Sequence, residues 1–313
     1  MLKPIISFVS PVYKCRDCLE KLVLEIRKAC ETIDVDFEII LVNDKCPEDS
    51  WEAIKELTKS TPEVTGINLS RNYGQHSAIE AGLSIVRGQW VVVLDCDLQD
   101  HPSALPAMWE KAMEGAEVVL VKRDARTDSW LRRAFSKTYY AVLSYLTGQK
   151  IDADIANFGL YQEKVIAAYN SWSEEQKYFP VMIQWLGFKQ TTISVKHNER
   201  HAGKSSYNLK TLLKLGTNVV LSFSDRPLWI MSMIGGLIAA LSFFFGGIYL
   251  IWALLGGSDV QGWPSIVISI WFLGGANIAA AGLIGIYLGR VLREAKERPS
   301  FVISEIASHQ TGK

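Results

Sequence analysis

Hydrophobic and polar positions in the first 125 residues follow two alternating periods. Runs of apolar, largely β-branched residues are typical of strands that are buried on both faces. Between these runs, apolar residues recur at helical spacing, as at Leu19, Leu22 and Ile26. The alternation predicts an α/β fold with a Rossmann-like, mostly parallel sheet. The strand-like runs are residues 5–9, 37–42, 64–69, 90–94 and 117–121.

A cluster of polar residues follows each of these runs. Right-handed crossover connections bring the carboxyl ends of parallel strands to the same edge of a sheet. Ligands of open α/β sheets bind in the crevice at that edge. We therefore expect one shared site, built from Ser10–Tyr13, Asn43–Asp44, Ser70–Gly74, Asp95–Asp97 and Lys122–Arg123.

Asp95 and Asp97 give this site its first chemical character. They follow the run at 90–94 and are separated by one residue. Two neighbouring carboxylates repel each other unless a cation lies between them, so the pattern predicts a divalent metal ion that holds a phosphorylated ligand. A solvated acidic turn is the alternative. The chain has no GxGxxG after the first strand and no GxxxxGK[ST], which argues against a dinucleotide site and a P-loop.

The middle of the chain is less regular. Residues 197–206 form a basic loop that contains glycine, and Arg, Lys and backbone N–H groups of such a loop suit phosphate binding. A flexible surface loop is the alternative. The other elements predicted here are a basic helix at 129–147, helices near 162–171 and 175–186, and a strand at 191–195.

Two long stretches near the C-terminus carry no formal charge. They are residues 228–255 and 264–289, and each exceeds the roughly 20 apolar residues that a membrane span needs. Basic residues lie outside the pair and not in the short turn between them, so the positive-inside rule places both ends in the cytosol. The amphipathic pattern at 207–223 favours a helix in the membrane interface over an ordinary packed helix.

The predicted organisation therefore has four parts. They are a cytosolic catalytic domain over 1–206, an amphipathic juxtamembrane segment over 207–226, a transmembrane hairpin over 227–290 and a cytosolic basic tail over 291–313.

Composition adds little about partners but something about compartment. Lys+Arg and Asp+Glu are equal at 33 each, so net charge says nothing about partners, and we expect no nucleic acid among them. The first residues lack the pattern of a signal peptide, and we expect the N-terminal domain to stay in the cytosol with its five cysteines reduced. Cys15 and Cys18 form a CxxC pair, which we interpret as the start of a helix and not as a redox or metal site.

Several motifs in order make the chain resemble a known family. The resemblance is to the polyprenyl-phosphate glycosyltransferases of family 2, relatives of dolichyl-phosphate mannose synthase, and it covers about residues 4–303. It implies a GT-A catalytic domain, often assembled as a tetramer. It also implies an inverting transfer of a sugar from a nucleotide sugar, expected to be UDP-linked, to undecaprenyl or another polyprenyl phosphate at the inner membrane. The motifs are residues 9–13, 69–76, 95–100, 200–207, 222–228 and 296–299.

The resemblance also assigns roles to single residues. The nucleotide sugar would be bound by Pro11, Tyr13, Asp44, Arg71, Asp95 and Gln99. The cofactor, Mg²⁺ or Mn²⁺, would be held by Asp95 and Asp97. The acceptor phosphate would be bound by Arg123, Arg132, Ser136, Arg200 and Ser205. The catalytic positions would be Asp97, Asp154 and Asn157.

The chain departs from the family at three of its motif positions. Members commonly have Asp-x-Gly-Asp-Phe-Arg-Leu where this chain has Asn157 and Gly159 in place of the second Asp and the Arg. Asn157 cannot accept a proton, but a lipid monophosphate has a second pKa of about 6 and is mostly a dianion at neutral pH. A strong base is then unnecessary. The third departure is Ile286, where relatives usually carry Glu.

Two other functions stay open. Asn157 and Gly159 would also fit a catalytically inactive membrane scaffold of the same fold. A processive polysaccharide synthase would need more membrane spans and a QxxRW motif, which this chain lacks. The transferred sugar is not determined by the sequence: glucose, galactose, N-acetylhexosamines and modified pentoses all remain.

Overall fold

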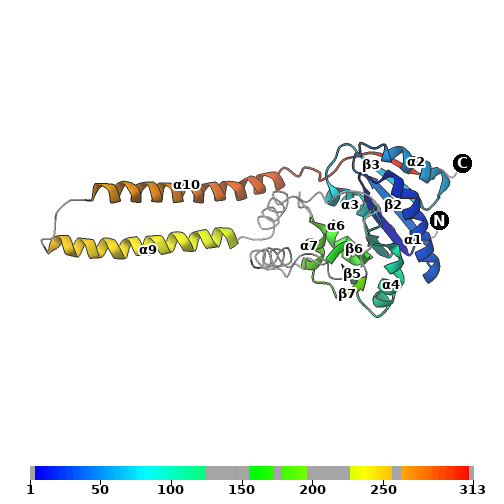
Figure 1. Ribbon diagram of the computed structural model, residues 1–313, viewed down its shortest axis with the longest axis horizontal. Helices are drawn as coiled ribbons and strands as arrows, with labels where there is room; N and C mark the ends of the chain where they lie inside the picture. Colours follow the sequence, from blue (N-terminus) through cyan, green and yellow to red (C-terminus); the bar gives the residue numbers. More distant parts are fainter. Residues whose placement is uncertain are drawn as a thin grey trace. The chain divides into compact units, whose positions relative to one another are not determined.

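The computed structural model describes residues 4–123, 145, 155–172, 178–195, 226–255 and 262–309. The chain divides into two units (Figure 1). The first consists of Met1–Ala141, Lys150–Tyr207 and Glu297–Lys313, and the second of Val142–Gln149 and Asn208–Lys296. The predicted helix at 129–147 (apart from Tyr145), the basic loop and the amphipathic segment lie outside the described residues.

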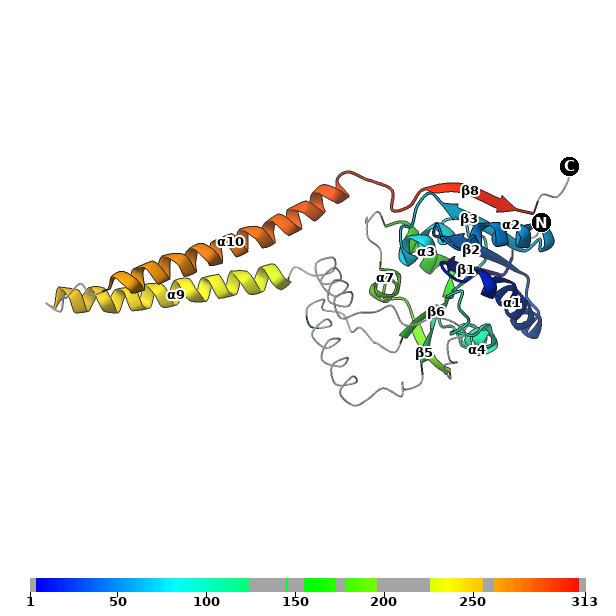
Figure 2. The same ribbon diagram turned by 45° about the horizontal axis from the view of Figure 1, so that its top comes forward.

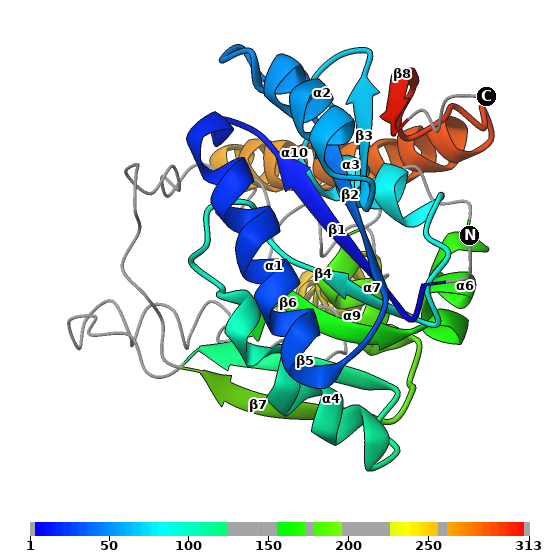
Figure 3. The ribbon, with the colours of Figure 1, turned by 90° about the vertical axis from the view of Figure 1, so that its right-hand side faces the viewer.

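In the described residues, eight strands of the first unit form one sheet in the order β7-β5-β6-β4-β1-β2-β3-β8. Figure 3 follows this order from β8 and β3 at the top to β5 and β7 at the bottom. The five predicted strands are confirmed, and β1 pairs in parallel with β2 and β4, as β2 does with β3. Their bounds are β1 Ile6–Val12, β2 Phe37–Asn43, β3 Val64–Leu69, β4 Trp90–Val93 and β5 Val118–Arg123.

Strand β6 (Ile155–Gln162) was not predicted and makes the sheet mixed. It lies antiparallel between β4 and β5, and β7 (Gln190–Val195) pairs in parallel with β5. Phe158, Leu160 and Tyr161 are buried in β6. Gly159 between them hides the strand from a propensity argument, because glycine disfavours strands.

Strand β8 (Ile303–Ser308) corrects the prediction of a tail over 291–313. It pairs antiparallel with β3, as Figure 2 shows for the red strand beside β3. The Ser304 hydroxyl donates to the carbonyl of Asn68 at 3.0 Å, and the Trp51 indole donates to Glu305 at 3.0 Å. Only short, alternating apolar positions mark this strand, so its pairing partner decides its conformation.

Helices cover both faces of the sheet. Leu22 and Ile26 of α1 pack in the same core as Ile6 and Phe8 of β1. On the other face, a Cβ on Gly82 of α3 would lie 2.4 Å from Val9, so α3 approaches β1 closely. The predicted helices near 162–171 and 175–186 are α6 and α7. The bounds are η1 Arg16–Cys18, α1 Leu19–Ile33, α2 Ser50–Ser60, α3 Gln75–Leu83, η2 Pro102–Ala104, α4 Leu105–Met113, α6 Glu163–Asn170 and α7 Phe179–Trp185.

The second unit contains two long helices, α9 (Arg226–Leu254) and α10 (Trp263–Glu294), which lie side by side and antiparallel (Figure 1). They coincide with the two uncharged stretches. Among the described residues, one stretch is long and apolar enough to cross a membrane, Phe272–Glu294, and Arg226–Ile238 is a shorter apolar helix. Many large apolar side chains on both helices are exposed, including Trp229, Phe244 and Ile270.

Candidate functional site

The candidate site lies at the carboxyl ends of β1 to β4, where the polar clusters were expected to meet. The amide of Leu94 donates to the carbonyl of Val9 at 3.1 Å. This bond extends the contact between β4 and β1 up to residues 95–100, which we call the acid motif. Asp95 and Asp97 follow, both half-buried, with Cys96 buried between them. The strand pairing therefore fixes where the two carboxylates begin.

Asp44, at the end of β2, holds the loop that follows β3. Its two carboxylate oxygens accept hydrogen bonds from the backbone amides of Tyr73 at 2.7 Å and Gly74 at 2.9 Å. Asp44 is only 3% exposed. Burial raises the pKa of its carboxyl above the usual value, and the two N–H donors offset part of that rise. Asp44 thus orders the loop, and its role in binding the nucleotide sugar stays a prediction.

Gln75, the first residue of α3, joins this loop to the acid motif. Its Nε2 donates to Oδ1 of Asp95 at 2.6 Å. The amide of Gln99 donates to Oδ1 of Asp97 at 3.1 Å, and the intervening Leu98 is buried with a φ of 58°. A left-handed leucine costs about 1–2 kcal/mol. Such strain persists only where the surrounding structure holds it, and it concentrates at functional sites.

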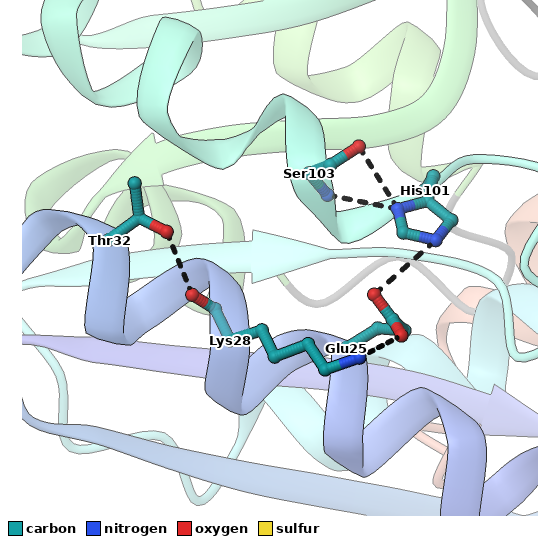
Figure 4. Close-up of polar contacts among 5 residues, drawn as sticks. All are labelled: Glu25, Lys28, Thr32, His101 and Ser103. Atoms are coloured by element: carbon teal, nitrogen blue, oxygen red, sulfur yellow. Dashed lines mark hydrogen bonds and ion pairs between the residues drawn. The ribbon is translucent and has the colours of Figure 1, made fainter.

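His101 ties the end of the acid motif to α1 (Figure 4). Its Nδ1 accepts a hydrogen bond from the amide of Ser103 at 3.2 Å, and its Nε2 lies 3.6 Å from Glu25 of α1. Lys28 donates to Glu25 at 2.9 Å and lowers the pKa of that carboxyl, and Thr32 donates to the carbonyl of Lys28. The motif is therefore anchored at both ends.

Cys15 contacts the backbone of the acid motif. Its thiol donates to the carbonyl of Cys96 at 3.2 Å. Contact with Cys96, then burial and the nearby Cys18, raise the pKa of the Cys15 thiol. Cys15 directly precedes η1, and all five cysteines are free. The pair at 15 and 18 thus begins a helix, as predicted.

Two residues predicted to bind the nucleotide sugar, Pro11 in β1 and Tyr13 just after it, lie beside the same edge. Pro11 is buried in β1 beyond Val9, where the ladder to β4 ends, so its missing N–H costs no ladder hydrogen bond there. Tyr13 is 46% exposed. Arg71 stacks on the ring of Tyr73 at 4.5 Å.

Asn157 lies on β6, which the sequence did not reveal as a strand. The last ladder pair with β4 joins Val93 to Gly159. Continued by two residues, the same register would put Asn157 across from Asp95. The catalytic role of Asn157 stays a prediction.

Other predicted residues are not tested. Arg123 ends β5, and its side chain is outside the described part. The residues that lie wholly outside it are Arg132, Ser136, Asp154, Arg200 and Ser205.

His76 is a residue of this region that the sequence analysis assigned no role. Its ring contacts the ring of Tyr178, with the centroids 4.3 Å apart and the planes tilted by 57°, and burial lowers its pKa to about 4. Among the described residues, its buried Nδ1 has no hydrogen-bond partner. In the sequence, only its position one residue after Gln75, at the end of the motif at 69–76, indicated that His76 belongs to this region.

Comparison with known proteins decides the family. A sequence model of glycosyl transferase family 2 matches residues 7–171. The chain belongs to glycosyltransferase family 2. This glycosyltransferase is 32% identical over 299 residues to the bactoprenol glucosyl transferase of Shigella phage SfV, which covers 95% of the chain and 97% of the relative. It is 32% identical over 304 residues to the undecaprenyl-phosphate 4-deoxy-4-formamido-L-arabinose transferase of Edwardsiella ictaluri, covering 96% of the chain and 94% of the relative.

The fold comparison agrees with the family. The glycosyltransferase resembles glucosyl-3-phosphoglycerate synthase from Mycobacterium tuberculosis, solved with Mn²⁺, UDP-glucose and phosphoglyceric acid. The TM-score is 0.50 at 15% identity, over 70% of this chain and 78% of the other. The expected GT-A fold is confirmed, and the relatives bear out the resemblance to the polyprenyl-phosphate branch of the family.

Proposed function

We propose that this glycosyltransferase moves a sugar from a UDP-sugar to undecaprenyl or another polyprenyl phosphate at the cytosolic face of the membrane. The product would be a lipid-linked sugar donor for modification of cell-envelope glycans. The observation that carries the proposal is the pair Asp95 and Asp97 after β4, with Asp95 held by the side chain of Gln75 and Asp97 by the amide of Gln99. Relatives over nearly the full length carry names of transferases that act on bactoprenol or undecaprenyl phosphate.

A divalent cation, Mg²⁺ or Mn²⁺, fits the residues present. Among the described residues, no group of three or more His, Cys, Asp or Glu side chains could hold a metal by itself. Asp95 and Asp97 supply two carboxylates, which suits a cation that binds one or two carboxylates together with substrate phosphates. When bound, the cation would neutralise charge that develops on the departing nucleoside diphosphate.

The remaining chemistry is a displacement at the anomeric carbon of the sugar. An oxygen of the lipid phosphate forms the new bond as the bond to the nucleoside diphosphate breaks, and the anomeric configuration inverts. Asn157 cannot take a proton, and the acceptor needs none removed, because a phosphate monoester with a second pKa of about 6 is mostly a dianion at neutral pH. The chain's task is then to hold the two phosphate-bearing substrates in line.

The membrane assignment rests on α9 and α10. Residues 228–255 and 264–289 would form a hairpin, with 207–226 in the interface and 1–206 in the cytosol. Apolar side chains exposed along both helices fit a lipid environment or contacts with other copies in a tetramer. Lys and Arg residues beyond the two stretches fit a cytosolic position for both ends.

The test is a transfer assay with the full-length protein in detergent. Labelled UDP-sugars are incubated with undecaprenyl phosphate and Mg²⁺ or Mn²⁺, and lipid extracts are compared with a reaction that contains EDTA. We expect one donor to give a lipid-linked sugar that EDTA prevents. A label that enters no lipid with any nucleotide sugar would favour the inactive scaffold, and a polymeric product would favour the processive synthase.

A further inference from the structure

A side-chain hydrogen bond from Gln75 joins the start of α3 to Asp95 of the acid motif. Nε2 of Gln75 lies 2.6 Å from Oδ1 of Asp95. A carboxylate can only accept, so the amide nitrogen must be the donor. The bond therefore fixes one oxygen of Asp95 with a donor that carries no charge.

The position of Gln75 is itself determined by the end of β2. Gly74 precedes α3 with a φ of 94°, and a Cβ there would have open space, so glycine is needed for its conformation and not for room. Asp44 holds the amides of Tyr73 and Gly74. The ends of β2, β3 and β4 are thus joined by hydrogen bonds that run from Asp44 through the loop to Asp95.

The other end of the sheet shows how this fold treats an acid with a purely structural role. Glu38 is buried at the start of β2 and accepts from Nε of Arg87 at 2.8 Å and from its Nη2 at 2.6 Å. The Ser7 hydroxyl and the backbone amide of Arg87 donate to the other carboxylate oxygen at 2.6 Å and 2.8 Å. The charge of this acid is therefore met by a guanidinium that donates twice to one of its oxygens. The hydrogen bond from Gln75 to Asp95 comes instead from a neutral amide, which adds no positive charge at that oxygen.

We propose that Gln75 is a positioning residue of the metal–diphosphate site: it fixes the carboxylate of Asp95 without cancelling its charge. The inference rests on the proposed function. Groups that hydrogen-bond to metal ligands typically change metal affinity about 10- to 100-fold when removed. A lysine at this position could keep a hydrogen bond to Asp95 but would compete with the cation.

The test measures how much a metal strengthens nucleotide binding. UDP is titrated into the detergent-solubilised full chain by calorimetry, with Mn²⁺ and with EDTA, and the ratio of the two Kd values is the metal-dependent gain. We expect Gln75→Ala to reduce this gain about 10-fold or more while the Kd in EDTA changes less than about twofold. Gln190→Ala is the matched control, because Gln190 is an exposed glutamine on β7.

Gln75→Lys separates positioning from packing. If the bond to Asp95 merely stabilised the fold, lysine would restore both the Tm and the metal-dependent gain. We expect lysine to keep the Tm within a few degrees of the native protein while the gain is lost. A Gln75→Ala or Gln75→Lys protein with the full native gain overturns the inference. A native protein without any gain, with UDP and with the other nucleoside diphosphates, overturns the metal site itself and the inference with it.

Discussion

At the residue scale, the ring of Tyr161 occupies the space that a side chain at Gly159 would need. A Cβ on Gly159 would lie 2.4 Å from the hydroxyl oxygen of Tyr161, two residues along β6. The Tyr161 ring is fully buried and packs edge-on against Phe179 at 5.2 Å. A side chain at 159 would have to move this ring, so glycine at this position is matched to the aromatic packing of β6.

Substitution of Asn157 should reduce kcat less than substitution of Asp97. Loss of a general base typically costs about 10²- to 10⁴-fold in rate. Because the acceptor phosphate is already ionised, we expect Asn157→Ala to lose less than about 10-fold in kcat. Asp97→Ala should lose about 100-fold or more, as charge-stabilising groups do. Initial rates with saturating lipid phosphate measure both variants, and an equal abolition would show that residue 157 takes part in the chemistry.

His76 should make the protein less stable in mild acid. Its pKa is about 4 in the fold and about 6.5 in an unfolded chain, so the unfolded state binds the proton first as the pH falls. Stability supported by neutral His76 is present above pH 6.5 and is lost between pH 6.5 and 4, up to about 3 kcal/mol of unfolding free energy. We expect His76→Phe, which keeps a ring against Tyr178, to flatten the fall in Tm over this range. Parallel curves for the two proteins would assign the acid sensitivity elsewhere.

At the scale of elements, the segment that leads into β8 contacts the loop from Ser70 to Gln75. The amide of Ser70 donates to the carbonyl of Val302 at 2.9 Å, just before β8 begins. Ser70 is the first residue of the loop that Asp44 binds at Tyr73 and Gly74 and that ends at Gln75. The strand therefore protects the edge of β3 from other chains and fixes the first residue of the loop that reaches Asp95.

Removal of β8 should weaken donor binding as well as stability. Each backbone hydrogen bond contributes roughly 0.5–1.5 kcal/mol, so loss of those near Ser70 should weaken the affinity for UDP and Mn²⁺ about 10-fold. We expect a chain that ends at Ser300 to show this loss and a lower Tm. A chain that ends at His309, which keeps β8, is the control. If the shorter chain lost Tm but kept native affinity, β8 would serve stability alone.

The elements also show which features a sequence can predict. β1 to β5 were predicted because β-branched runs and strand–helix alternation are local signals, and the acid site followed from where strands end. β6 was missed because Gly159 interrupts it, and β8 because its pairing with β3 joins Thr65 to Ser308 across most of the chain. Gln75 has no local signal either, because its partner Asp95 is 20 residues away.

At the scale of the whole molecule, the order of the elements constrains any membrane crossing. The chain leaves the sheet after β7, passes through α9 and α10, and returns to the same sheet as β8. Strands of one sheet lie on one side of a membrane. A crossing by Phe272–Glu294 therefore requires a second crossing between β7 and β8, and residues 228–255 are the stretch that is long enough.

The turn between the two stretches should consequently lie on the opposite side from the sheet. A cysteine introduced by Ser258→Cys, in the turn, should react with a membrane-impermeant maleimide in right-side-out vesicles. A cysteine introduced by Gln190→Cys, on exposed β7, should react only in inverted or permeabilised vesicles. The native protein, whose free cysteines all lie before residue 97, provides the background. Labelling of both positions from the same side would mean that α9 and α10 do not cross the membrane as a hairpin, and the apolar faces would then have to be covered by other copies of the chain.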